Sequence, residues 1–307
     1  MFKLAHISDV HLGPLPPVLP WQLANKRITG YLNWKLNRRS QMGIDVLAPL
    51  VAHMKASNPD HIIVSGDLTN LALPSEINRM EQWLRDLGDP GFVSATLGNH
   101  DAYVPGAARA CQRSWAPYMR GDGETDVPGP DAAPVQSPYR RDRGDVAMII
   151  ANSGVATLPF IAGGWLGKRQ ISHAANLIRL ARADGKQIVF VVHHPPFQGA
   201  TPFVKKLFDD AALRQMLARN GVDLVLHGHT HLDTLAFIDG PGKPIPVVGV
   251  ASASQSPTAA GEPHGHKPAA QYNLLTFEKA GQPIVLERIG YRHGETRIKV
   301  LEEKQLG

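Results

Sequence analysis

The chain has 307 residues, of which 43% are hydrophobic and 19% are charged, a composition that excludes a disordered chain and allows a large core. Its single cysteine, Cys111, excludes an internal disulfide, and no run of about 18 apolar residues predicts a membrane span. The first residues lack the apolar segment of a secretory signal, so we expect a cytoplasmic protein. The net charge of +5 equals the five Lys and Arg residues of segment 21–40, which contains no acid, so no broad nucleic-acid-binding face is expected.

Short apolar runs and helical patterns alternate over the first two thirds of the chain. Runs rich in Val, Ile or Phe predict strands at 2–8, 61–65, 92–97, 146–151, 187–192 and 222–226. Apolar residues at helical spacing predict helices at 42–57, 75–87, 171–183 and 209–219. This alternation predicts an α/β fold, in which ligands bind at the carboxyl ends of the strands.

The pattern changes after His231, in the C-terminal third of the chain. Strands are expected at 235–238, 245–250, 272–277 and 283–289, with no helix between them. We therefore expect a mostly antiparallel second sheet that packs on the first. We expect a single domain over 1–307, with a basic aromatic insertion at 14–40 and a loop insertion rich in Gly, Pro and Asp at 121–145.

Polar turns follow five of the predicted strands. Their sequences are DVH from Asp9, GDLTN from Gly66, GNHD from Gly98, HHPP from His193 and GHTH from Gly228. Imidazole and carboxylate groups bind divalent Mn, Fe or Zn, and the absence of cysteine argues against a structural zinc site. The turns hold more candidate ligands than one tetrahedral ion needs, so they favour a pair of ions.

These five motifs, in this order, resemble those of the calcineurin-like metallophosphoesterase superfamily, and in particular its bacterial branch similar to class III cyclic-nucleotide phosphodiesterases. The resemblance implies a four-layer α-β-β-α sandwich of two mixed sheets flanked by helices. It also implies two divalent metal ions (Mn, Fe or Zn), of which Asp67 bridges both. The implied ligands are Asp9, His11, Asp67, Asn99, His193, His229 and His231. The family pattern His-x-Pro-Pro selects His193 over His194.

The resemblance further implies a hydrolase that cleaves a phosphodiester by attack of a metal-activated hydroxide. His100 is then the general acid that protonates the leaving oxygen, and Asp101 orients its ring. The expected substrate is a small-molecule phosphate ester. Tyr139, Arg140, Arg141 and His194 are candidate substrate contacts, because arginine forks suit phosphate. The other interpretation of the arginines, a solvated charged turn before the strand at 146–151, is preferred.

The basic aromatic segment 21–40 has two interpretations. Trp21, Ile28 and Tyr31 share one side at helical spacing, whereas the basic residues lie largely off it. Such a segment is typical of a helix that contacts an anionic membrane, here at the inner membrane face. A cap over the active site or a dimer contact is the other interpretation, and it is slightly favoured.

Two other functions compete with the phosphodiesterase. One is a membrane-associated pyrophosphatase that acts on a nucleotide-linked lipid precursor, similar to the UDP-diacylglucosamine hydrolase of lipid A synthesis. That family carries Arg where this chain has His100, which counts against it. The other is a non-catalytic scaffold on the same fold, and the complete set of ligand positions argues against it.

Overall fold

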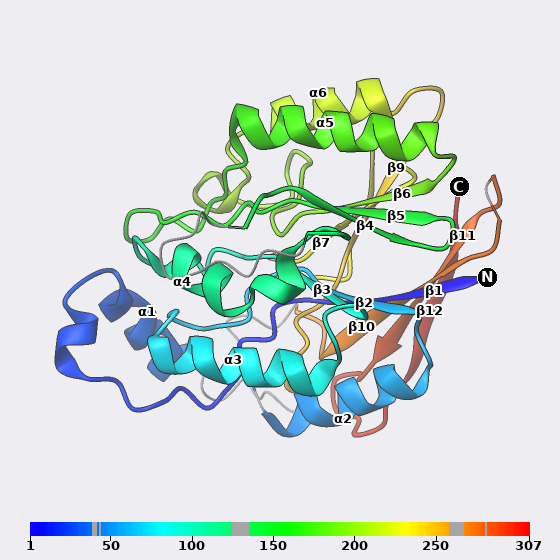
Figure 1. The fold of residues 1–307 in the computed structure, drawn as a ribbon. Helices are drawn as coiled ribbons and strands as arrows, with labels where there is room; N and C mark the ends of the chain where they lie inside the picture. Colours follow the sequence, from blue (N-terminus) through cyan, green and yellow to red (C-terminus); the bar gives the residue numbers. More distant parts are fainter. Residues whose placement is uncertain (39–41, 43, 125–134, 258–266, 280) are drawn as a thin grey trace.

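Two six-stranded sheets lie face to face in the computed structural model, with helices on both outer faces (Figure 1). The structure describes residues 1–38, 42, 44–124, 135–257, 267–279 and 281–307. Both sheets contain parallel and antiparallel pairs, so the four layers confirm the predicted α-β-β-α sandwich of two mixed sheets. Within the described residues, no helix has the length and apolar character needed to cross a membrane.

The first sheet has the strand order β12-β11-β10-β1-β2-β3. Its strands are β1 (Phe2–Ile7), β2 (His61–Val64), β3 (Val93–Ala95), β10 (Gln271–Phe277), β11 (Ile284–Gly290) and β12 (Lys299–Leu306). β1, β2 and β3 run parallel, and the other three are antiparallel to their neighbours. Helices α2 (Ile44–Ala56) and α3 (Pro74–Leu87) cover its outer face (Figure 1).

The second sheet has the strand order β4-β5-β6-β7-β9-β8. Its strands are β4 (Tyr139–Arg143), β5 (Val146–Ile150), β6 (Gln187–Val191), β7 (Leu224–His227), β8 (Leu235–Ile238) and β9 (Ile245–Gly249). Helices α5 (Gly167–Ala183) and α6 (Asp210–Asn220) cover its outer face (Figure 1). Ile178 of α5 and Leu213 of α6 pack against Ile188 and Phe190 of β6 in one buried cluster.

The remaining helices are short. They are α1 (Arg27–Asn33), α4 (Ala107–Ser114), η1 (Pro20–Leu23), η2 (Trp34–Arg38), η3 (Ala116–Met119) and η4 (Phe203–Lys205). α1 stands off from the four layers at one end of the sandwich (Figure 1). Arg39 and Ser40, at the end of the predicted basic segment, lie outside the described residues.

The prediction that the C-terminal third of the chain forms a separate second sheet is wrong. β10 pairs with β1 and continues the first sheet, whereas β9 pairs with β7 and continues the second. Both β1 and β7 would otherwise leave a row of backbone groups unpaired, and the later strands satisfy them. Hydrophobic alternation identifies a strand but not its partner, so the sequence could not assign these pairs.

The carboxyl-terminal part of the predicted loop insertion at 121–145 is a strand. β4 lies at the edge of the second sheet and pairs with β5 through a hairpin. Residues 125–134 of that insertion lie outside the described residues.

Candidate metal centre

The five polar turns meet at one end of the sandwich. Three follow β1, β2 and β3 of the first sheet, and two follow β6 and β7 of the second. Parallel strands present their carboxyl ends at the same edge, which explains why turns far apart in sequence converge. A cavity of about 340 Å³ opens here, and its wall includes Asp67, Asn99, His100, His229 and His231.

Asp9, His11 and His231 form one buried group of potential ligands. The Nε2 atom of His231 lies 3.1 Å from Oδ1 of Asp9, and Nε2 of His11 lies 3.9 Å from that same oxygen. The two Nε2 atoms are 3.4 Å apart. Three donor atoms that converge within this distance can hold one metal ion.

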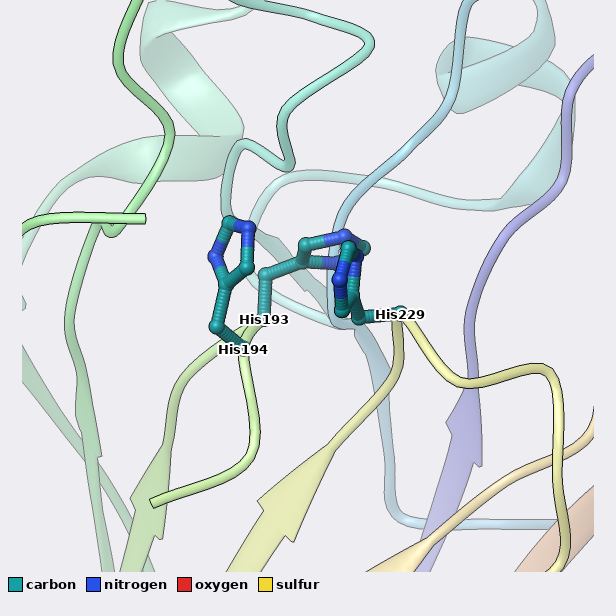
Figure 2. Close-up of side chains that lie close together, drawn as sticks. All are labelled: His193, His194 and His229. Carbon is teal, nitrogen blue, oxygen red and sulfur yellow. The ribbon is translucent and has the colours of Figure 1, made fainter. Parts of the chain in front are cut away.

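Asp67 lies between this group and a second one. Its Oδ2 atom is 3.8 Å from Nε2 of His11 and 3.3 Å from Nε2 of His193. The rings of His193 and His229 are 5.2 Å apart between centroids, and Figure 2 shows their side chains turned toward one another. A carboxylate in this position supports the predicted bridging role of Asp67.

Both carboxylates are fixed through one oxygen by a backbone amide. Oδ2 of Asp9 accepts the His229 amide at 2.9 Å, and Oδ1 of Asp67 accepts the His100 amide at 2.7 Å. The second oxygen of each carboxylate is the one that faces the imidazoles. The turns therefore hold one oxygen of each Asp in place and present the other to the cluster.

Backbone carbonyl oxygens orient the imidazoles. A carbonyl only accepts hydrogen bonds, so the ring nitrogen that faces it carries the proton, and the lone pair of the neutral ring lies on the other nitrogen. The pairs are His11 Nδ1 with Thr69 (3.0 Å), His193 Nδ1 with Ser65 (2.8 Å), His229 Nε2 with Lys205 (2.8 Å) and His100 Nδ1 with Asn70 (2.6 Å). This arrangement is typical of metal-binding histidines.

The geometry favours His193 over His194 as a ligand. Both ring nitrogens of His194 have partners, since Nδ1 lies 2.8 Å from the Ser153 hydroxyl and Nε2 lies 3.2 Å from the Ala162 carbonyl oxygen. Burial and the neighbouring His193 lower the pKa of His194 to about 3, so its ring is neutral. His194 and His193 are both fully buried, and His194 belongs to the same group of potential ligands as His193 and His229, so its predicted contact with substrate stays a prediction.

Asp101 binds the backbone of the surrounding turns, and its predicted role in orienting His100 stays a prediction. Its carboxylate accepts hydrogen bonds from the backbone amides of Leu68, Thr69 and Gly98 at 2.9–3.0 Å. It also accepts a hydrogen bond from the Thr69 hydroxyl. The Asn70 carbonyl takes the expected place beside the His100 ring. Main-chain acceptors leave no signature in a sequence, so motif analysis could not find this one. Asp101 instead ties the turn after β2 to the turn after β3.

The backbone of the cluster is unusual. Among the described residues, eight non-glycine residues have positive φ, and five of them are predicted ligands: Asp9, His11, Asp67, His229 and His231. Left-handed backbone is disfavoured for L-residues and concentrates at functional sites. Two of the motif positions require glycine because a side chain would not fit there. A Cβ at Gly98 would collide with the Asp67 carboxylate, and a Cβ at Gly228 would collide with Ser8 and Asp9.

The donor set fits divalent cations. Among the described side chains, Oδ1 of Asp9, Oδ1 of Asn99 and Nε2 of His193 are buried without a hydrogen bond. Burial opposes ionisation of Asp9, but His231 and His193 hold its pKa below the usual range. Burial lowers the pKa of His193, whereas Asp67 raises it to about 9. These carboxylates are ionised and favour protonation of the neighbouring imidazoles. A divalent cation bound between them can take the place of those protons.

Tyr139, Arg140 and Arg141 lie on β4, away from the cavity wall, and this corrects their predicted contact with substrate. The Tyr139 hydroxyl donates to the Ala95 carbonyl oxygen at 2.8 Å. The Arg140 guanidinium pairs with two aspartates, and that of Arg141 is buried and donates to backbone carbonyls. These contacts occupy guanidinium N–H groups that would otherwise be available to bind phosphate.

Part of the basic segment lies against the cavity. Lys26, Thr29, Gly30 and Asn33 line it. The remaining wall comes from Tyr103, Phe160, Ile161, Ala162, Lys205 and Lys267. These six residues lie outside the five motifs, so motif analysis could not select them.

Comparison with known proteins agrees with this geometry. A family model described as calcineurin-like phosphoesterase matches residues 2–233. A relative from a Synechococcus strain, named as a probable cyclic nucleotide phosphodiesterase, is 29% identical over 203 residues. The match covers 64% of this chain and 66% of the relative, which is just under two thirds of its length.

Two solved structures share the fold. A dimetal phosphatase from Danio rerio superimposes with a TM-score of 0.60 at 11% identity, over 99% of this chain and 98% of that one. A purple acid phosphatase from yellow lupin seeds superimposes with a TM-score of 0.55 at 13% identity, over 99% of this chain and 53% of that one. At these identities the likeness shows the fold alone.

Proposed function

The chain belongs to the calcineurin-like phosphoesterase family, and from this premise we propose that it is a phosphoester hydrolase that cleaves a phosphodiester with two divalent metal ions. The ligands proposed for the pair are Asp9, His11, Asp67, Asn99, His193, His229 and His231. One observation carries the proposal: buried carboxylates and imidazoles from both sheets converge around Asp67, with potential ligand atoms within 4.8 Å of one another in each group.

Bound divalent ions would supply positive charge to the phosphoryl oxygens and would lower the pKa of a water molecule. The chain's own contribution at the leaving group is His100. Its Nδ1 proton is held by the Asn70 carbonyl, so a proton given to the leaving oxygen must come from Nε2 of the imidazolium.

A diester of small size is the favoured substrate. The cavity of about 340 Å³ is at the small end of ligand sites, and α1 limits it on one side. The relative from Synechococcus is named as a probable cyclic nucleotide phosphodiesterase, which supports a diester over a monoester. The scaffold and lipid-precursor pyrophosphatase alternatives are not favoured, because the candidate ligand positions and His100 are all filled.

A metal-dependent activity assay tests the proposal. The purified chain, stripped with chelator and reloaded with Mn²⁺, Fe²⁺ or Zn²⁺, should hydrolyse bis-p-nitrophenyl phosphate faster than p-nitrophenyl phosphate. The matched control is Asp67→Asn, which keeps the side-chain shape but removes the bridging charge. Turnover that is absent with every divalent metal, together with no metal bound, would exclude the proposal. A preference for the monoester would overturn the diester assignment only.

A further inference from the structure

Exposed apolar side chains gather around the mouth of the metal cavity. Among the described residues, ten of the fourteen large hydrophobic side chains that are exposed lie in the three segments 19–36, 157–165 and 203–206, which we call the docking face. Phe160 is 83% exposed, Leu36 77% and Phe203 73%. An exposed apolar concentration of this kind marks an interaction site rather than ordinary surface.

The three segments form one continuous rim. The Lys26 ammonium donates to the Thr157 hydroxyl at 2.7 Å and to the Ile161 carbonyl at 2.8 Å, which joins the first segment to the second. The Ala162 amide donates to the Val204 carbonyl at 2.8 Å, which joins the second to the third. Each segment also contributes to the cavity wall. Phe160 itself lines the cavity, and the other exposed side chains lie on the same three segments that form its wall.

The docking face carries positive charge and no negative charge. Its basic residues are Lys26, Arg27, Lys35, Lys205 and Lys206, and none of the three segments contains Asp or Glu. Lys35 and Lys205 are exposed. Large apolar side chains flanked by cations are complementary to an anionic lipid surface. The apolar side chains enter the headgroup region, and the cations contact lipid phosphates.

We propose that the docking face binds the surface of an anionic lipid bilayer and turns the mouth of the metal cavity toward the lipid headgroups. Aromatic residues such as Trp21, Phe160 and Phe203 favour the boundary between headgroups and acyl chains. A second copy of the chain fits this face less well. Two-fold pairing through it would bring the exposed Lys35 and Lys205 of one copy toward those of the other, and none of the three segments supplies an acid.

Vesicle co-sedimentation of the full chain tests the proposal. The bound fraction should be higher on phosphatidylcholine vesicles that contain phosphatidylglycerol than on phosphatidylcholine alone, and added salt should lower it. The double variant Lys35→Glu with Phe203→Ser should weaken binding to the anionic vesicles by at least about tenfold. Neither residue lines the cavity, and melting curves establish that the variant is folded.

The matched control carries the same two changes elsewhere. Phe237 on β8 is also exposed, and Lys243 lies in the exposed loop that follows it, so Phe237→Ser with Lys243→Glu should bind as the parent does. Equal binding to neutral and anionic vesicles, no binding, or equal loss in both variants would overturn the proposal. Self-association that only the docking-face variant abolishes would assign the face to a second copy instead. No readout depends on hydrolysis, so failure here leaves the proposed function untouched.

Discussion

His100 donates its Nδ1 proton to the carbonyl oxygen of Asn70, and three further imidazoles of the cluster face carbonyl oxygens in the same way. The position of a carbonyl oxygen depends on backbone conformation, so the orientation of these rings depends on the conformation of the turns that hold them. The positive φ values at Asp9, Asp67 and His229 show how tightly those turns are shaped. At this scale the site depends on the backbone as much as on its side chains.

Replacing His100 by alanine should remove acid catalysis without removing metal. The predicted ligands do not include this ring, so metal content measured by mass spectrometry should match the parent. Loss of a general acid costs about 10²–10⁴-fold in kcat. The loss should be largest for an alkyl diester and smallest for bis-p-nitrophenyl phosphate, whose leaving group needs no proton. Metal content that falls in parallel with activity would mean that His100 is a ligand.

Asp101→Asn should act on stability rather than on the acid step. The carboxylate accepts backbone amides of Leu68, Thr69 and Gly98, and an asparagine amide group would turn N–H donors toward some of them. Each mismatched buried donor costs about 1–3 kcal/mol, so the urea midpoint should fall. Metal affinity should fall with it, because these turns carry Asp67 and Asn99. A variant with parent-like stability and a selective loss of kcat would instead favour the pairing with His100 that the motifs suggested.

At the scale of elements, burial decides which strands the sequence predicts. β5 and β6 are buried throughout and rich in Val and Ile, so their apolar runs identify them. β4 and β12 are rich in charged residues, and each lies at the edge of its sheet. An edge strand in contact with solvent has no need of an apolar run and is often charged. The ligand turns were predictable because they follow buried strands, whereas the carbonyls that orient the imidazoles and the cavity wall were not.

Arg141 illustrates how an element can give a charged residue a structural role. Its buried guanidinium on β4 donates to the carbonyls of Val93, Pro117 and Arg120, which joins the edge strand to β3 and η3. Arg141→Met should therefore lower the free energy of unfolding by about 3 kcal/mol or more, because several buried acceptors lose their donor. Urea unfolding measures this loss, and KM for the diester should stay at the parent value.

The neighbouring arginine supplies the control for that measurement. Arg140 forms partly exposed ion pairs with Asp142 and Asp184, and such pairs contribute about 0–1 kcal/mol. Arg140→Met should therefore unfold near the parent midpoint. If Arg141→Met instead raised KM and left stability unchanged, Arg141 would contact substrate after all.

At the scale of the whole molecule, the proposed metal pair joins the two sheets. Asp9, Asp67 and Asn99 follow strands of the first sheet, whereas His193 and the two histidines after β7 follow strands of the second. Without a cation, the buried carboxylates depend on imidazoles and backbone amides to offset their charge, and burial of charge is costly. Metal bound at this junction would stabilise the contact between the sheets in addition to serving the reaction.

Metal removal should therefore destabilise the whole sandwich. A ligand that binds only the folded state stabilises it by about 2.7 kcal/mol at a concentration one hundred times its Kd, so reloading chelated protein should raise Tm by several degrees. Hydrogen exchange should slow in the turns after both β1 and β7, because the cation ties one sheet to the other. Asp67→Asn should abolish both effects, whereas His100→Ala should retain them. Protection confined to the turns of one sheet would place the metal within that sheet and contradict the bridging arrangement.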